Sequence, residues 1–179
     1  EDILIGKHFT SIKETVPKSS QKRLEDETYK IFERINFKNE TGLVVGYIQS
    51  GKTLSFEALT AMGRDNEVSI TIILAGISKI LTDQTYNRIY DDFNINKGKY
   101  WILENTKKKG SNVGLHKQSI SYIKNTLNSQ FDPNTIVKKG LLIVSMKNYK
   151  HINSIAEVLS SPELSDLMKK AKVLIIDDE

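Results

Sequence analysis

The run GYIQSGKT at residues 46–53 constrains the fold of this chain more than any other feature. It matches the pattern G-x-x-x-x-G-K-[S/T] without a mismatch. The preceding residues 42–45 (GLVV) predict a short buried strand, and residues 54–62 (LSFEALTAM) predict a helix. A glycine-bearing loop between a strand and a helix is typical of phosphate binding, because the loop N–H groups and the positive helix N-terminus converge on the phosphate.

The residues of this loop have separate expected roles. Backbone N–H groups would surround the β-phosphate, the Lys52 ammonium would reach the β- and γ-phosphates, and the Thr53 hydroxyl would hold magnesium. We therefore expect ATP and Mg²⁺ as cofactors, with Lys52 as a catalytic residue. The alternative is an ordinary glycine turn followed by an exposed lysine. The expected nucleotide-binding residues are Gly46, Gln49, Ser50, Gly51, Lys52 and Thr53.

A second motif ends the sequence. Residues 173–176 (VLII) predict an apolar strand that is followed directly by Asp177, Asp178 and Glu179. This is the Walker B pattern, and ligands of open α/β sheets bind at the carboxyl edge of the strands. We expect Asp178 to help hold magnesium and Glu179 to accept a proton from the attacking water. The pattern assigns no role to Asp177. The adjacent glutamate favours hydrolysis over transfer of a phosphoryl group to a small molecule.

Apolar strands alternate with helical segments between the two motifs. Residues 68–74, 100–103 and 140–145 are continuous apolar or β-branched runs, as in strands covered on both faces. The alternation predicts an α/β fold, a RecA-like P-loop NTPase domain with a mainly parallel sheet and helices on both faces. We expect an N-terminal helical extension over residues 1–40 and this ATPase lobe over residues 41–179. The expected helices between the strands cover residues 78–92, 116–129, 149–159 and 162–170.

Other local expectations are less regular. The first fifteen or so residues have no clear periodicity, and a helix with Ser20 as its N-cap is expected to follow Pro17 and to end near Asn36. Residues 63–66 (GRDN) are expected to break the helix after the phosphate loop, and the polar, glycine-bearing residues 105–115 predict a mobile loop.

The composition excludes several kinds of site. The 179 residues include no cysteine, which excludes disulfides, thiolate metal sites and cysteine nucleophiles. Three scattered histidines have no metal-ligand spacing. No apolar run approaches the roughly 20 residues of a membrane span, and the sequence shows no signal peptide. We therefore expect a cytoplasmic protein with no membrane partner.

Positive charge is concentrated in residues 97–150. This segment carries eleven lysines, no arginine and only two acidic residues, a net charge of +9. Such an excess is typical of a surface that binds a phosphate backbone. Because lysine lacks the planar fork that reads base edges, we expect backbone contacts with little sequence reading. The alternative is a solvated lysine-rich surface, since the sequence does not show whether these lysines share a face.

Four stretches together resemble the Z-one domain family, prokaryotic helicase-like ATPases that are often described as endonucleases. The resemblance spans roughly residues 24–179, and its most specific part is the QSGKT of the phosphate loop. It implies the first RecA-like lobe of a superfamily-two-like ATPase in bacterial DNA processing or anti-phage, restriction-like defence. The four stretches are residues 41–53, 74–88, 141–148 and 174–179.

The resemblance also implies partners. It places candidate contacts to a nucleic-acid strand, most simply DNA, at Gln84, Thr85, Arg88, Lys147 and Asn148. Family members often carry an arginine where this chain has Thr82, which puts one expected phosphate contact in doubt. The chain has no initial Met and stops within the Walker B region. We therefore expect it to belong to a larger protein whose second RecA-like lobe supplies an arginine finger, and to hydrolyse ATP weakly alone.

Two other functions fit the same motifs. The first is a nucleotide-operated switch, in which ATP orders a loop and a protein partner reads the change without movement along a strand. The second is a small-molecule phosphotransferase, which the glutamate at position 179 disfavours.

Overall fold

The computed structural model describes residues 2–35, 52–106, 108–109, 112–113, 115 and 117–178, with the side chains of residues 52–53, 108–109, 112–113 and 117–118 outside that description. The chain divides into two compact units, residues 1–68 and 69–179. The expected domain boundary between residues 40 and 41 and the expected strand over residues 42–46 lie outside the described residues.

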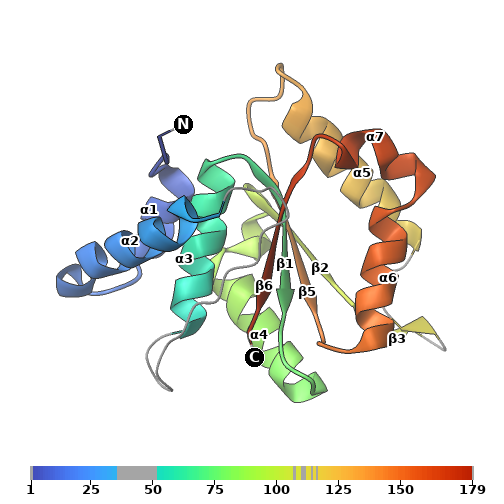
Figure 1. Cartoon of the computed structure of the whole chain (residues 1–179), viewed down its shortest axis with the longest axis horizontal. Coiled ribbons are helices and arrows are strands. Elements are labelled where there is room, and N and C mark those ends of the chain that lie inside the picture. Colours follow the sequence, from blue (N-terminus) through green and yellow to red (C-terminus); the bar gives the residue numbers. More distant parts are fainter. Residues whose placement is uncertain are drawn as a thin grey trace. The chain divides into compact units, whose positions relative to one another are not determined.

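The first unit is helical in its described part (Figure 1). Two helices, α1 and α2, both pack against a third, α3. Phe9 of α1, Phe32 of α2 and Met62 of α3 are buried in this unit. The helices are α1 (Lys7–Lys13), α2 (Lys18–Glu33) and α3 (Lys52–Asp65).

The carboxylate of Asp65 fixes the start of α1. It accepts hydrogen bonds from the backbone N–H groups of Gly6 (3.0 Å), His8 (3.1 Å) and Phe9 (2.9 Å). The first N–H groups of a helix have no partner within the helix and favour negative charge. Asp65, at the end of α3, therefore caps a helix more than fifty residues earlier in the sequence.

One expectation for this unit is wrong: the N-cap of α2 is Pro17, with no side-chain bond, and Ser20 lies inside the first turn. The expected break of the helix over residues 63–66 is confirmed, because α3 ends at Asp65. Helix α1 lies in the stretch for which the sequence shows no clear periodicity.

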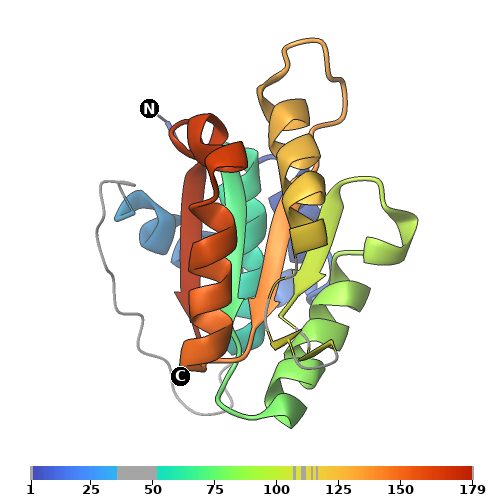
Figure 2. The same cartoon turned by 90° about the vertical axis from the view of Figure 1, so that its right-hand side faces the viewer.

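The second unit contains a parallel sheet of four strands in the order β2-β5-β1-β6 (Figure 2). Ile72 of β1 lies opposite Ile143 of β5, and Leu103 of β2 lies opposite Leu142 of β5. The expected strands over residues 68–74 and 140–145 are confirmed. The strands are β1 (Val68–Leu74), β2 (Trp101–Asn105), β5 (Gly140–Ser145) and β6 (Lys172–Asp177).

The order of the strands decides which helices cover which face. The chain passes from β1 beyond β5 to the edge strand β2, and then returns through β5 to β6 on the far side of β1. Because crossovers between parallel strands are right-handed, opposite directions of travel place the helices on opposite faces. Helix α4 accordingly covers one face, and α5, α6 and α7 cover the other (Figure 1). The helices are α4 (Lys79–Asp92), α5 (Lys117–Phe131), α6 (Tyr149–Leu159) and α7 (Ser165–Met168).

The core of this unit lies between the sheet and α5 and α6. Ile70 and Ile143 point from the sheet into a cluster with Ile123, Leu127 and Ile155. Three-residue 3-10 turns, η1 (Ile95–Lys97) and η2 (Pro162–Leu164), precede β2 and α7. The expected loop over residues 105–115 contains a short antiparallel pair, β3 (Lys108–Lys109) and β4 (Asn112–Val113). Among the described residues, no helix has the length and apolar character needed to cross a membrane.

Candidate functional site

The carboxyl edge of the sheet has the geometry of a binding site between β1 and β5. These neighbouring strands send their following helices, α4 and α6, to opposite faces of the sheet. In open parallel sheets, ligands bind outside the carboxyl ends of two such strands, because the chain segments that follow them diverge there. The turns after β1 and β5 therefore form the candidate site.

Backbone hydrogen bonds hold these two turns together. Ala75 N–H donates to the Ser145 carbonyl (2.8 Å), and Lys147 N–H donates to the Gly76 carbonyl (2.7 Å). Gly76 has a φ of 66°, in the left-handed region that favours glycine. The pairing of β1 with β5 thus continues past both strands, and it places Lys147 beside the turn that leads into α4.

An ion pair joins the end of β5 to the end of β6. The Lys147 ammonium lies 2.9 Å from the Asp177 carboxylate, with a third of the lysine side chain and almost half of the aspartate side chain exposed. Strands β5 and β6 are not neighbours, because β1 lies between them. The Lys147 side chain therefore reaches across the carboxyl end of β1.

The expected metal ligand Asp178 lies at this edge. Its N–H donates to the Leu74 carbonyl (3.1 Å), so the pairing of β6 with β1 extends one residue past the strand. Its side chain is half-buried. A carboxylate in this position is the kind of oxygen ligand that Mg²⁺ takes. The expected base, Glu179, lies outside the described residues, and among the described residues no group of three or more His, Asp or Glu side chains could hold a metal ion.

The five candidate nucleic-acid contacts fall into two groups. Lys147 and Asn148 lie in the turn after β5, where Asn148 is the N-cap of α6 and its side chain accepts a hydrogen bond from Lys150 N–H (2.9 Å). Gln84, Thr85 and Arg88 lie further along α4, and the Arg88 guanidinium is 3.5 Å from the Asp92 carboxylate. At 1.5 Å per residue, Arg88 is about 15 Å from the N-cap of α4.

Thr82 has a structural role in α4. Its hydroxyl is buried and donates to the carbonyls of Ala75 (3.0 Å) and Ser78 (3.0 Å). The side chain therefore points at the end of β1 and not at solvent. Because its hydroxyl is buried and bonded to the backbone, Thr82 does not supply the phosphate contact expected of an arginine at this position.

A chain of hydrogen bonds that the sequence did not predict links three elements at this edge. His151 Nδ1 lies 2.8 Å from the Thr106 hydroxyl, which donates to the Ser145 hydroxyl (3.0 Å), which donates to the Met146 carbonyl (3.1 Å). Since Thr106 uses its one proton on Ser145, His151 Nδ1 must carry a proton and donate it to Thr106. Ser145 ends β5, Thr106 follows β2 and His151 lies in the first turn of α6, and these positions at the carboxyl edge are the signal that could have indicated them.

Burial lowers the pKa of His151 below its ordinary value, and a hydrogen bond to the backbone of Thr106 opposes that shift. The imidazole, Thr106 and Ser145 together tie α6 to the ends of β2 and β5.

The phosphate-loop residues fall mostly outside the described residues: Gly46, Gln49, Ser50 and Gly51 are not described. The backbone of Lys52 and Thr53 is described, and it forms the first residues of α3, which begins at Lys52. The expected helix after the loop is therefore confirmed, and the roles expected for these six residues stay predictions.

The lysines of residues 97–150 do not form one surface. Lys97, Lys99, Lys138 and Lys139 precede β2 or β5, which places them at the amino edge of the sheet. Lys147 and Lys150 follow β5, and the backbone of Lys108 and Lys109 follows β2, so these lie at the carboxyl edge. These eight lysines are thus divided between opposite edges of the sheet.

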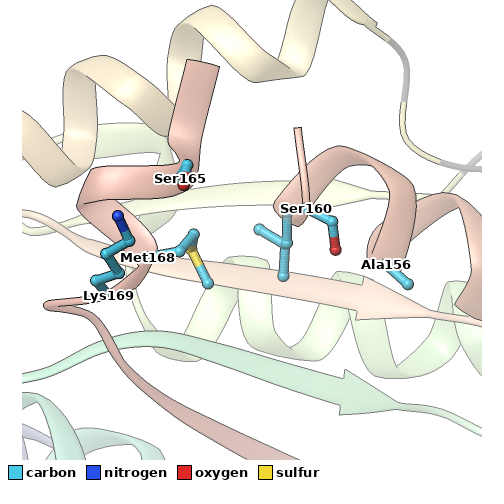
Figure 3. Close-up of a pocket in the computed structure, with 6 residues that line it drawn as sticks. Ala156, Ser160, Ser165, Met168 and Lys169 are labelled. Atoms are coloured by element: carbon cyan, nitrogen blue, oxygen red, sulfur yellow. The ribbon is translucent and has the colours of Figure 1, made fainter. Parts of the chain in front are cut away.

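A shallow groove lies elsewhere in the second unit, between the end of α6 and α7 (Figure 3). Met168 points into it between Ser160 and Lys169. The groove contains no carboxylate, and Lys169 is paired with Asp166 at 2.9 Å. The end of α6 and α7 lie toward the amino edge of the sheet, away from the carboxyl ends of β5 and β6 (Figure 1). Its lining residues are Ala156, Leu159, Ser160, Ser165, Met168 and Lys169.

Comparison of the chain with protein-family models, with curated proteins and with solved structures found no match.

Proposed function

We propose that this chain is the nucleotide-binding lobe of a helicase-like, nucleic-acid-dependent P-loop ATPase that acts inside bacterial cells in DNA processing or defence. The observation that carries the proposal is the sequence GYIQSGKT followed at once by a helix that begins at its lysine, Lys52. A helix N-terminus directly after a glycine-bearing loop is what phosphate binding requires. The parallel sheet and the acidic end of β6 support the same proposal.

The proposed site divides the chemistry among few residues. Lys52 neutralises charge on the β- and γ-phosphates, and Thr53 and Asp178 hold the metal. Magnesium, when bound, neutralises the charge that develops on the phosphate oxygens. Glu179 accepts a proton from the attacking water. An arginine finger in a second RecA-like lobe would complete the site, so the isolated chain should hydrolyse ATP slowly.

The nucleic-acid strand is proposed to bind at the carboxyl edge of the sheet. Asn148 and Lys150 are exposed there, and Lys147 is partly exposed beside them. Gln84, Thr85 and Arg88 extend the surface along α4. Because these groups are amides, a hydroxyl and cations, we expect contacts to the phosphate backbone and affinity that falls steeply with salt.

A second function is favoured by the apolar character of the same edge. The side chains of Ile77, Ile80 and Tyr149 are each more than 70% exposed, in the turn after β1 and at the starts of α4 and α6. Exposed apolar side chains at one edge of the sheet favour contact with a protein partner. A nucleotide-operated switch with a protein partner would use this surface without any movement along a strand.

The test is ATP binding and hydrolysis by this chain, beside Lys52→Ala and Glu179→Gln. We expect the chain to bind a fluorescent ATP analogue in the presence of Mg²⁺, and Lys52→Ala to abolish binding. Glu179→Gln should keep binding and lose the residual hydrolysis. Absence of analogue binding by the unaltered chain would refute the proposal.

Binding to DNA distinguishes the two proposed functions. A motor lobe should bind single- or double-stranded DNA with a strong salt dependence. A switch should ignore DNA at 50 mM salt, and the double variant Ile77→Ser/Ile80→Ser should then weaken capture of its protein partner without changing analogue binding.

A further inference from the structure

The first acid at the end of β6, Asp177, has no assigned role in the Walker B pattern, and its contacts suggest one. Its carboxylate lies 2.9 Å from the Lys147 ammonium. We propose that Asp177 is a positioning residue and not a metal ligand: its ion pair with Lys147 crosses the end of β1 and holds the turn between β5 and α6 in place. The part that concerns the metal depends on the proposed nucleotide site.

The direction of the two carboxylates supports this division of roles. Asp177 is the last residue of β6, and the pairing with β1 continues through Asp178, whose N–H donates to the Leu74 carbonyl. Successive side chains of an extended strand point to opposite sides. We therefore expect Asp177 and Asp178 to face opposite sides, and Asp177 is the one that lies beside the Lys147 ammonium.

The ion pair acts on a turn that is already anchored at its backbone. Lys147 N–H donates to the Gly76 carbonyl, so the Lys147 main chain is fixed to the turn after β1. The side chain then continues across β1 to Asp177 on β6. Three strand ends are thereby joined through one lysine. The next residue, Asn148, is the N-cap of α6, so the position of Lys147 also sets where α6 begins.

A partly exposed ion pair is weak enough to exchange partners. The Lys147 and Asp177 side chains keep contact with solvent, and such pairs contribute little net stability. The ammonium has three donors and can leave the carboxylate for a phosphate oxygen. The role of the ion pair is to position the turn, which it keeps ordered until a competing anion displaces the carboxylate.

The experiment measures amide hydrogen exchange of residues 147–152 in the whole 179-residue chain by NMR. Asp177→Asn should raise the exchange rates of these amides several-fold, because the turn loses its ion pair to the end of β6. Lys147→Arg should keep the protection. The charge-reversed double variant Lys147→Asp/Asp177→Lys should restore it, which a merely structural loss would not allow.

A matched control makes the same chemical change elsewhere. Asp166→Asn removes the carboxylate from the exposed Asp166–Lys169 pair and should leave the exchange of residues 147–152 unchanged. The proposal would be overturned if residues 147–152 exchanged at the same rates in Asp177→Asn as in the unaltered chain. It would also be overturned if the double variant protected these amides no more than Lys147→Asp or Asp177→Lys alone.

Magnesium dependence separates positioning from metal binding. Binding of a fluorescent ATP analogue by Asp177→Asn should keep the Mg²⁺ dependence of the unaltered chain within about twofold, whereas Asp178→Asn should lose it. Loss of that dependence in both variants would make Asp177 a metal ligand and overturn the proposal. If the unaltered chain binds no analogue, the proposed function fails, and the exchange measurements still decide whether Asp177 positions the turn.

Discussion

Gly6 shows how one residue permits the contact that holds α1 in place. A Cβ at this position would lie 2.5 Å from Asp65 Oδ1 and 2.6 Å from its Cγ. The carboxylate cannot withdraw without losing its hydrogen bonds to Gly6, His8 and Phe9. We expect Gly6→Ala to lower the free energy of unfolding by about 1–3 kcal/mol, measured by urea denaturation.

The control for this prediction is Ser11→Ala, an exposed position in the same helix. It should change the free energy of unfolding by less than about 0.5 kcal/mol. A Gly6→Ala protein as stable as the Ser11→Ala protein would mean that Asp65 can move aside at no cost.

His8, beside the same carboxylate, makes stability depend on pH. Burial lowers the pKa of His8 to about 4, against an attraction to Asp65 that raises it and repulsion from Lys7 and Arg64 that lowers it further. Between pH 6.5 and 4 the unfolded chain therefore binds a proton that the folded chain does not. Stability due to His8 is present above pH 6.5 and is lost as the pH falls through this window.

The substitution that tests this is His8→Gln, with urea unfolding at pH 7 and pH 4.5. The loss of stability between these pH values should be smaller in His8→Gln than in the unaltered chain, by about 1–2 kcal/mol once the partial exposure of the ring is considered. Equal losses in the two proteins would contradict the buried, neutral histidine.

At the residue scale, the sequence reveals motifs, but it does not reveal ion-pair and hydrogen-bond partners that lie far apart along the chain. The acids that follow the apolar run 173–176 are readable because their position after a strand is local information. The partner of Asp177 is not readable, because Lys147 lies thirty residues earlier, in the turn after β5, and β5 is not a neighbour of β6 in the sheet. His151 reads as an isolated histidine for the same reason: Thr106 and Ser145 come from other elements.

At the scale of elements, sequence patterns predict the helices and strands that are stabilised mainly by their own residues. The strands β1 and β5 and the helix α6 match their expected residues, because continuous apolar runs and a regular apolar stripe form over their whole length. Helix α1 has only two buried residues, Phe9 and Ile12, and no side-chain cap of its own. A seven-residue helix is marginal alone. Its stability depends on Asp65, which the sequence does not place beside it.

Gln130, on α5, joins the amino ends of β1 and β5 through hydrogen bonds. Its buried amide Nε2 donates to the carbonyl of Ser69 in β1 (3.0 Å) and to that of Lys139 just before β5 (2.7 Å). Glutamate has the same shape and no N–H. Gln130→Glu would remove both hydrogen bonds and place a carboxyl group against two carbonyls, at a cost of about 3–5 kcal/mol.

Urea unfolding of Gln130→Glu at pH 7 measures this cost. Asn128→Asp, an exposed position on the same helix, makes the same amide-to-carboxylate change and should cost less than about 0.5 kcal/mol. Comparable destabilisation by the two substitutions would show that the added charge, and not the lost contacts, is responsible.

At the scale of the whole chain, the distribution of charge matters more than its sum. The sequence shows a net charge of +9 over residues 97–150, and the parallel sheet divides the lysines between its two edges. Residues before a parallel strand and residues after it lie a strand length apart, about 20 Å for six residues. Sequence order alone cannot reveal this, because Lys138, Lys139 and Lys147 are close neighbours along the chain.

The division yields a prediction with an internal control. Lys147→Gln/Lys150→Gln removes two charges from the carboxyl edge, and Lys138→Gln/Lys139→Gln removes two from the amino edge, so the net charge changes equally. If a strand binds at the carboxyl edge, only the first pair should weaken binding of single-stranded DNA. Each lost phosphate contact should lower the slope of log affinity against log salt by about 0.7. Fluorescence anisotropy between 50 and 200 mM salt measures that slope, and an equal reduction in both double variants would mean that the whole charge attracts DNA without a defined surface.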